Sequence, residues 1–225
     1  MAATLVLASA SPRRLDLLRQ IGIEPGLVDP ADLDETPLPA ESPRDYALRM
    51  ARAKFEAIAV RHPDSLVLAA DSVVAVGRRI LPKAESEQQA RACLKLMSGR
   101  RHKVLGGVAL GRTGGKLQVR LVETAVRFKR LESSEIEEYI ASGEWRGKAG
   151  GYAIQGKAMM QVSTASVEQL DLGDAFSRSI SGADSTLHRG GRRSYSLEGV
   201  PPTAQGLSIL SQPPALKRML HMKER

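Results

Sequence analysis

Two adjacent arginines near the start of the sequence have the spacing of an anion-binding site. The segment 8–14 reads Ala-Ser-Ala-Ser-Pro-Arg-Arg and overlaps the end of a short apolar run at 4–8. A serine followed by a proline is typical of a helix start, so Arg13 and Arg14 fall in a first helical turn, where the helix dipole disfavours cations. A bound phosphate would remove this conflict by accepting hydrogen bonds from backbone N–H groups and guanidinium groups. The alternative interpretation is two solvated arginines on an exposed turn.

A carboxylate follows an apolar run in the middle of the sequence. Residues 66–70 read Leu-Val-Leu-Ala-Ala, which is typical of a central strand, and Asp71 and Ser72 come directly after them. Ligands of α/β proteins bind off the carboxyl ends of such strands. Asp71 is therefore a candidate to bind a metal or to accept a proton from water, and Ser72 to hydrogen-bond a ligand. The alternative is an aspartate that caps the turn after the strand.

Three further charged residues are candidates for the same site. Glu35 lies in a proline-rich, acidic loop at 29–43, and hard oxygen ligands for Mg²⁺ gather in such loops. Lys54 lies one position away from the expected apolar face of a helix, so it could flank a cleft. Lys83 follows a predicted hairpin at 73–81. For Glu35 the alternative is a solvated acidic loop.

These residues need a scaffold in which strands alternate with helices and hairpins. Long strands are expected near 103–110 and 116–128, and helices are expected to begin at the serines 11, 42, 86 and 134. This order of elements predicts an α/β or α+β domain. From 163 to 196 the chain is rich in Ser, Arg, Gly and Asp without periodicity, which is typical of a mobile segment.

Composition limits the class of protein. The 225 residues carry a net charge of +8, which favours anionic partners in general, and Cys93 is the single cysteine, which favours a reducing compartment. No apolar run approaches the roughly 18 residues of a membrane span, and the first residues do not have the pattern of a signal peptide. We therefore expect a cytoplasmic protein that does not associate with membranes.

Several familiar motifs are absent. The glycine-rich segment at 111–116 does not have the spacing of a phosphate-binding P-loop, and the four histidines show no metal-ligand spacing. The basic residues are not interleaved with aromatic residues, so no stable complex with nucleic acid is expected.

Taken together, six ordered segments resemble the Maf family of nucleotide pyrophosphatases. They cover about residues 4–158 and read LVLASASPRR (5–14), ADLDET (31–36), ARAK (51–54), LAADSVVAVGRRILPK (68–83), LMSGRRHKVLGGVAL (96–110) and GKAGGYAIQG (147–156). The resemblance implies an α/β/α fold around a mixed, elongated sheet, a possible homodimer, and hydrolysis of nucleoside triphosphates to monophosphate and pyrophosphate. The Asp-Ser pair at 71–72 is similar to the branch that acts on dTTP and UTP.

The resemblance also implies a role for each site residue. Asp71 would be the catalytic carboxylate, and Glu35 would help it hold Mg²⁺ or Mn²⁺. Cations and a serine would bind the nucleotide or neutralise its triphosphate: Ser9, Arg13, Arg14, Lys54 and Lys83. Arg13, Ser72 and Gln155 would set the choice of substrate, with Gln155 facing the base.

The sequence departs from the family pattern mainly at its end. The resemblance predicts a catalytic domain over 1–162 and an atypical, partly disordered C-terminal segment over 163–225, which is an insertion, a diverged end or the product of a frameshift. Earlier in the chain, Ser72 and Gly106 stand where the family usually has threonine. Two other classes stay open: a regulator of cell division or nucleic acid without enzymatic activity, and a family member that binds nucleotides without turnover.

Overall fold

A single mixed sheet forms the frame of the molecule. The computed structural model describes residues 4–153, 157–158 and 162–171. The strands follow the order β2-β1-β3-β5-β6-β7, with β4 paired to β3. β1 pairs in parallel with β2 and β3, and the other neighbours are antiparallel. The strands are β1 (Leu5–Ala8), β2 (Leu27–Val28), β3 (Leu66–Val76), β4 (Arg79–Leu81), β5 (Arg101–Gly111), β6 (Gln118–Phe128) and β7 (Val162–Asp171).

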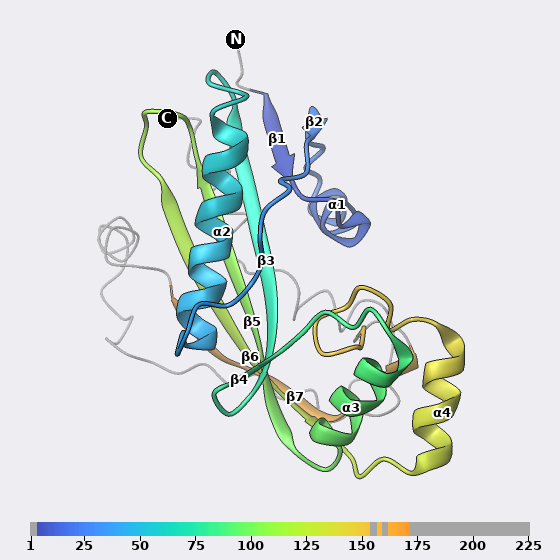
Figure 1. The fold of residues 1–225 in the computed structure, drawn as a ribbon. Helices are drawn as coiled ribbons and strands as arrows, with labels where there is room; N and C mark the ends of the chain where they lie inside the picture. The colour runs from blue at the N-terminus through green and yellow to red at the C-terminus, as the bar shows by residue number, and fades with distance from the viewer. Residues whose placement is uncertain (1–3, 154–156, 159–161, 172–225) are drawn as a thin grey trace, which may run out of the picture.

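In the part of the chain that the structure describes, four helices lie along or beside this sheet (Figure 1). α2 runs along the long strands, α1 lies beside β1, and α3 and α4 pack together near the opposite end of β5 and β6. The expected α/β class and the mixed, elongated sheet are thus confirmed. The helices are α1 (Pro12–Gln20), α2 (Pro43–Ala59), α3 (Glu87–Met97) and α4 (Ser133–Ser142).

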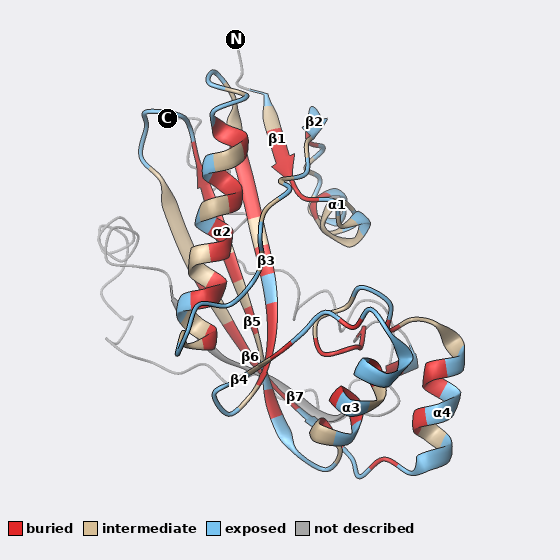
Figure 2. Ribbon diagram, viewed as in Figure 1, coloured by how far each residue is buried: buried red, intermediate tan, exposed pale blue. Residues whose placement is uncertain are grey.

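Helix α2 is seated directly on the sheet. Ser42 caps it by accepting a hydrogen bond from the Asp45 backbone N–H, and Pro43 occupies its first turn. A Cβ atom at Gly107 in β5 would lie 2.1 Å from the carbonyl oxygen of Ala47, so only glycine permits this approach. Figure 2 marks buried residues along both α2 and β3. Gly107 therefore permits a close contact between α2 and strand β5.

A second apolar cluster holds α3 and α4. Buried side chains from β3, β6, both helices and the loop after α4 meet there, including Val74, Phe128, Trp145 and Tyr152. This cluster anchors the loop that precedes the predicted Gln155. Gln155 itself lies outside the described residues.

Strand β3 differs from its prediction. It does not end at Ala70 but continues through Asp71 to Val76, because β5 pairs with it without interruption from Val67 to Ala75. On the other edge of β3, β1 covers residues 66–69 and β4 covers 74–76. Residues 70–73 thus form a gap between two neighbouring strands, and Asp71 lies in this gap rather than at a strand end.

Strand β7 was not expected from the sequence. It pairs with β6, with register shifts near Glu123 and Phe128, and extends the sheet past the domain boundary predicted at residue 162. The rest of the predicted C-terminal segment, 172–225, lies outside the described residues. Among the residues described, no helix is both long and apolar enough to cross a membrane.

Candidate functional site

A cleft of about 690 Å³ opens where β1 ends and where β3 has its gap. Its walls come from the start of α1, the middle of β3, β5 and β6, and the loop at 146–152. Of the residues predicted for the site, eight line it: Ser9, Arg13, Arg14, Glu35, Lys54, Asp71, Ser72 and Lys83. The structure therefore brings together all the predicted site residues that it describes.

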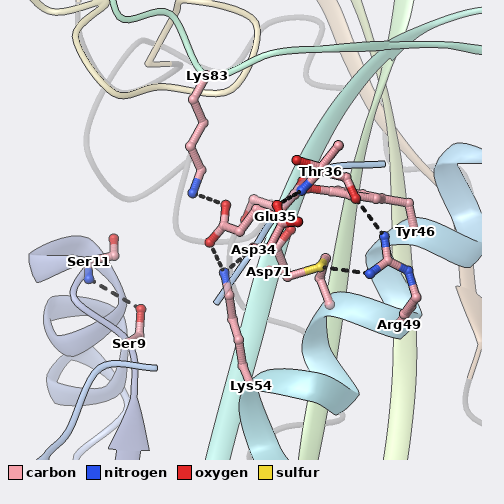
Figure 3. A network of polar contacts seen from close by, with 12 residues as sticks. Ser9, Ser11, Asp34, Glu35, Thr36, Tyr46, Arg49, Lys54, Asp71 and Lys83 are labelled. Atoms are coloured by element: carbon pink, nitrogen blue, oxygen red, sulfur yellow. Dashed lines mark hydrogen bonds and ion pairs between the residues drawn. The ribbon is translucent and has the colours of Figure 1, made fainter. Parts of the chain in front are cut away.

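The centre of the site is a buried ammonium group between two carboxylates (Figure 3). Lys54 Nζ lies 2.6 Å from Asp71 Oδ1 and 2.7 Å from Glu35 Oε1. The side chains of Lys54 and Asp71 are only 8% and 5% exposed, so water screens this pair little. Lys83 pairs with the other oxygen of Glu35. Two lysines and two carboxylates thus form one charged chain across the cleft.

Burial acts against the charge of Glu35 and works to raise its pKa. The hydrogen bonds from Lys54 and Lys83 outweigh this effect and hold the pKa of the Glu35 carboxyl below its usual value. Glu35 is therefore ionised at neutral pH.

The side chains of Asp71 and Ser72 point to opposite faces of the sheet, because successive side chains of a strand alternate. Asp71 meets Lys54 of α2, whereas Ser72 Oγ accepts a hydrogen bond from Arg14 Nη2 at 3.2 Å. Arg14 Nη1 also donates to Ser9 Oγ at 2.8 Å. Burial lowers the pKa of the Arg14 guanidinium, while the charges of Asp71 and Glu35 raise it. The gap in β3 lets groups from both faces reach the same cleft.

The start of α1 matches its prediction. Pro12 begins the helix and Ser11 is the N-cap, but the Ser11 side chain does not cap the helix. The Ser11 backbone N–H donates to Ser9 Oγ at 3.2 Å instead. Arg13 and Arg14 both line the cleft from this first turn. A helix N-terminus with two arginines thus faces the cleft, as an anionic ligand requires.

The glycine-rich loop at 147–151 brings Lys83 to the cleft. The backbone N–H of Ala84 donates to the Lys148 carbonyl at 3.0 Å, and that of Gly150 donates to the Pro82 carbonyl at 2.9 Å. Gly150 has φ +66°, and a Cβ atom there would lie 2.9 Å from Val74 Cγ1. Glycine at this position therefore lets the loop pack against β3 without strain.

Two cations of this loop were missed in the sequence. Arg146 and Lys148 line the cleft with Lys83. The signal that could have found them is their position, since Lys148 lies in the segment 147–156 that carries the family resemblance and Arg146 comes directly before it.

The predicted position of Asp71 in its strand is wrong, and the predicted metal site stays a prediction. Asp71 lies in mid-strand rather than at a carboxyl end, because the ladder to β5 is continuous there. Across the described part of the chain, no group of three or more His, Cys, Asp or Glu side chains is gathered as a metal site. Glu35 and Asp71 converge on one point, which the ammonium group of Lys54 occupies. A divalent cation such as Mg²⁺ often takes only one or two protein carboxylates beside substrate phosphates. The lone pairs that these carboxylates keep beside their bonds to Lys54 fit that mode of binding.

Comparison with known proteins gives consistent results. The family model described as Maf-like protein matches residues 4–169. A dTTP/UTP pyrophosphatase of Paramagnetospirillum magneticum is 64% identical over 160 residues, covering 71% of this chain and 84% of the relative. Proteins of the same name from Caulobacter vibrioides and Rhodospirillum rubrum are 64% and 62% identical over 154 residues, with 68% of this chain and 80% and 73% of the relatives covered.

The fold and the cleft define an α/β protein with a site rich in paired charges. With a family model that spans most of its length, the chain belongs to the Maf family. A solved nucleoside-triphosphatase / dITP/XTP pyrophosphatase of Mycobacterium abscessus covers 58% of this chain and 75% of its own, at 19% identity and a TM-score of 0.38, values too low to support any conclusion.

Proposed function

We propose that the protein hydrolyses nucleoside triphosphates, dTTP and UTP first among them, to the monophosphate and pyrophosphate. The observation that carries this proposal is the pair of carboxylates around Lys54 in a Maf-family cleft, and it is supported by relatives more than 60% identical that are named dTTP/UTP pyrophosphatases. A cleft of about 690 Å³ is within the usual size of a small-ligand site, roughly 300–1,000 Å³.

Asp71 is proposed as the general base. In this reaction a water oxygen attacks the α-phosphorus, the bond from that phosphorus to the bridging oxygen breaks, and pyrophosphate leaves. The proton of the water goes to a carboxylate oxygen of Asp71, and the hydrogen bond from Lys54 fixes the direction of that carboxylate. Asp71 has one oxygen bound to Lys54, so the other is available to the water.

The cations around the cleft are proposed to neutralise the phosphates. Arg13 and Arg14 act from the start of α1, and Lys83 acts from the opposite wall. Lys54 is proposed to reduce the repulsion between the phosphates and the carboxylate of Glu35, because its positive charge lies next to that carboxylate. A triphosphate carries about four negative charges, and without such cations it could not approach two carboxylates.

Glu35 and Asp71 are proposed to hold one divalent cation, Mg²⁺ or Mn²⁺, together with the substrate phosphates. When bound, this metal would supply positive charge next to the phosphoryl oxygens. Arg13, Ser72 and Gln155 are proposed to set the choice of nucleotide. We further propose that residues 1–162 act as the catalytic unit.

The proposal is tested by measuring pyrophosphate release from dTTP, UTP, CTP, 7-methyl-GTP and dATP with Mg²⁺ or Mn²⁺. The wild type is compared with Asp71→Asn and with Asp64→Asn, a matched change at an exposed aspartate outside the cleft. We expect release from dTTP and UTP, loss of at least 100-fold in Asp71→Asn with nucleotide binding retained, and no change in Asp64→Asn. A folded wild type that releases no pyrophosphate from any nucleotide would disprove the proposed function.

A further inference from the structure

Glu35 lies in a segment that has little regular structure of its own. Within the described residues, 30–37 make no hydrogen bond from backbone to backbone. A loop of this kind does not by itself fix the direction of a side chain, since each residue without such bonds loses backbone entropy when it is ordered. The contacts that order this segment must therefore come from side chains.

Helix α2 supplies those contacts from two residues spaced three positions apart. Tyr46 Oη donates a hydrogen bond of 2.6 Å to the backbone carbonyl of Glu35 itself. Arg49 Nη2 donates at 3.2 Å to the backbone carbonyl of the next residue, Thr36. Figure 3 shows both side chains reaching from α2 to this short stretch of main chain. Residues 46 and 49 lie on one face of a helix, so they act on the loop together.

Arg49 is itself held in place. Its Nε and Nη2 atoms donate to the two carboxylate oxygens of Glu41 at 2.6 Å and 2.8 Å, a bidentate pair. Glu41 Oε2 also accepts from the Leu38 backbone N–H at 2.9 Å. The guanidinium carbon lies 5.3 Å from the ring centroid of Tyr46, so the two side chains also contact each other.

We propose that Tyr46 and Arg49 form a clamp that positions Glu35, and with it the charged chain of Lys54, Asp71 and Lys83, for the reaction. This inference rests on the proposed function, because it assigns the clamp to the site of that reaction. Tyr46 and Arg49 are positioning residues, since they hold the main chain of Glu35 and Thr36. Lys54 belongs to the same helix, so α2 sets both the carboxylate and the ammonium group that it meets.

The role differs from simple packing. Tyr46 is 7% exposed and packs in a cluster with Met50 and Val73, and phenylalanine would keep this packing. The hydroxyl is the part that reaches Glu35.

The test compares Tyr46→Phe and Arg49→Lys with the wild type. Arg91→Lys is the matched control, because Arg91 makes a similar forked pair with Glu137 outside the cleft. Pyrophosphate release gives kcat and KM, and amide hydrogen exchange of residues 34–41 gives the order of the loop. Tyr46→Phe is also measured in a Glu35→Gln background, where a residue that acts through the carboxylate of Glu35 has little left to affect.

We expect kcat/KM to fall about 10- to 100-fold in Tyr46→Phe, mainly through kcat, and loop exchange to become faster. In the Glu35→Gln background the same substitution should change kcat/KM less than about twofold. Arg91→Lys should match the wild type in both measurements. Arg49→Lys keeps a charge but loses the fork, and it should follow Tyr46→Phe.

Rates within twofold of wild type and unchanged loop exchange in Tyr46→Phe and Arg49→Lys would overturn the clamp, as would a loss in Tyr46→Phe that is undiminished in the Glu35→Gln background. The wild-type rate alone decides the proposed function. If that rate is zero, the exchange measurement still decides whether Tyr46 and Arg49 order the loop.

Discussion

The buried ammonium group of Lys54 offers the sharpest test of the site, through Lys54→Met. This change keeps the length of the side chain and removes its charge, so two carboxylates lose their shared partner. Breaking a buried pair in this way costs about 3–5 kcal/mol, because an uncompensated charge stays in the interior. Glu35 is 28% exposed and keeps Lys83, so the lower end, about 3 kcal/mol, applies.

The assay is urea unfolding followed by the fluorescence of Trp145. This residue is the single tryptophan and is 1% exposed, so unfolding changes its surroundings completely. A loss of about 3 kcal/mol corresponds to a Tm lower by roughly 6–12 °C in a chain of this size. Lys129→Met is the matched control, because its partner Glu135 forms an exposed pair on the surface. It should cost less than about 1 kcal/mol.

The reasoning is refuted if Lys54→Met costs no more than Lys129→Met. A second variant tests the cause of the loss. Adding Asp71→Asn to Lys54→Met removes the unpaired buried charge and should recover at least half of the lost stability. If the double variant is less stable than Lys54→Met, the loss comes from packing rather than from charge.

Three further predictions follow from backbone and burial. Gly106→Thr should leave the urea midpoint unchanged or raise it, because a Cβ atom there would be 3.9 Å from its nearest neighbour. Gly107→Ala should instead prevent α2 from packing on the sheet and give no cooperative unfolding, because its Cβ atom would lie 2.1 Å from the Ala47 carbonyl oxygen. Gly150→Ala should cost about 1–3 kcal/mol more than Gly114→Ala in the same assay; both glycines have positive φ, but only Gly150 faces Val74 closely. Burial lowers the pKa of His102 to about 4, so the folded state favours the neutral imidazole. The free energy of unfolding should therefore fall by about 3 kcal/mol as the pH drops from about 6.5 to 4, because the unfolded state binds the proton more tightly. In His102→Gln the free energy of unfolding should fall less over the same pH range.

Much of the fold could be predicted because its helix signals are local. Ser42 and Ser86 accept the capping hydrogen bonds that their positions predict, from the N–H groups of Asp45 and Gln89. For α4 the cap was placed too late, because Glu132 rather than a serine forms the capping box. A glutamate is a rare N-cap, so its pattern was not recognised.

The predicted strand ended too early, at residue 70, because the polar residues that follow are typical of a turn. Asp71 and Ser72 follow five apolar residues, and only pairing with β5 keeps them in the strand. Strand β7 was missed since its sequence, VSTASVEQLD, lacks a run of apolar residues. Pairing with a distant strand decides both cases, and a local pattern does not contain that information.

Most of the site residues could be predicted from their types and positions, and the family motifs added roles to them, but their contacts with one another could not be predicted. Lysine is almost never fully buried, so a buried pair of Lys54 and Asp71 could not be predicted from their residue types. Tyr46 and Arg49 act across the space between a helix and an irregular loop, where no periodicity links the two partners. Whether each predicted residue performs its assigned role stays a prediction for the experiments above.

The gap in β3 has a consequence for self-association. An open strand edge invites another chain to add a strand, which is a common first step in aggregation. Here the open stretch is limited to residues 70–73, with β1 and β4 closing it on either side. A typical strand has five or six residues, so a foreign strand has too little room to pair. The same opening that admits a small molecule is thus too short to nucleate a fibril.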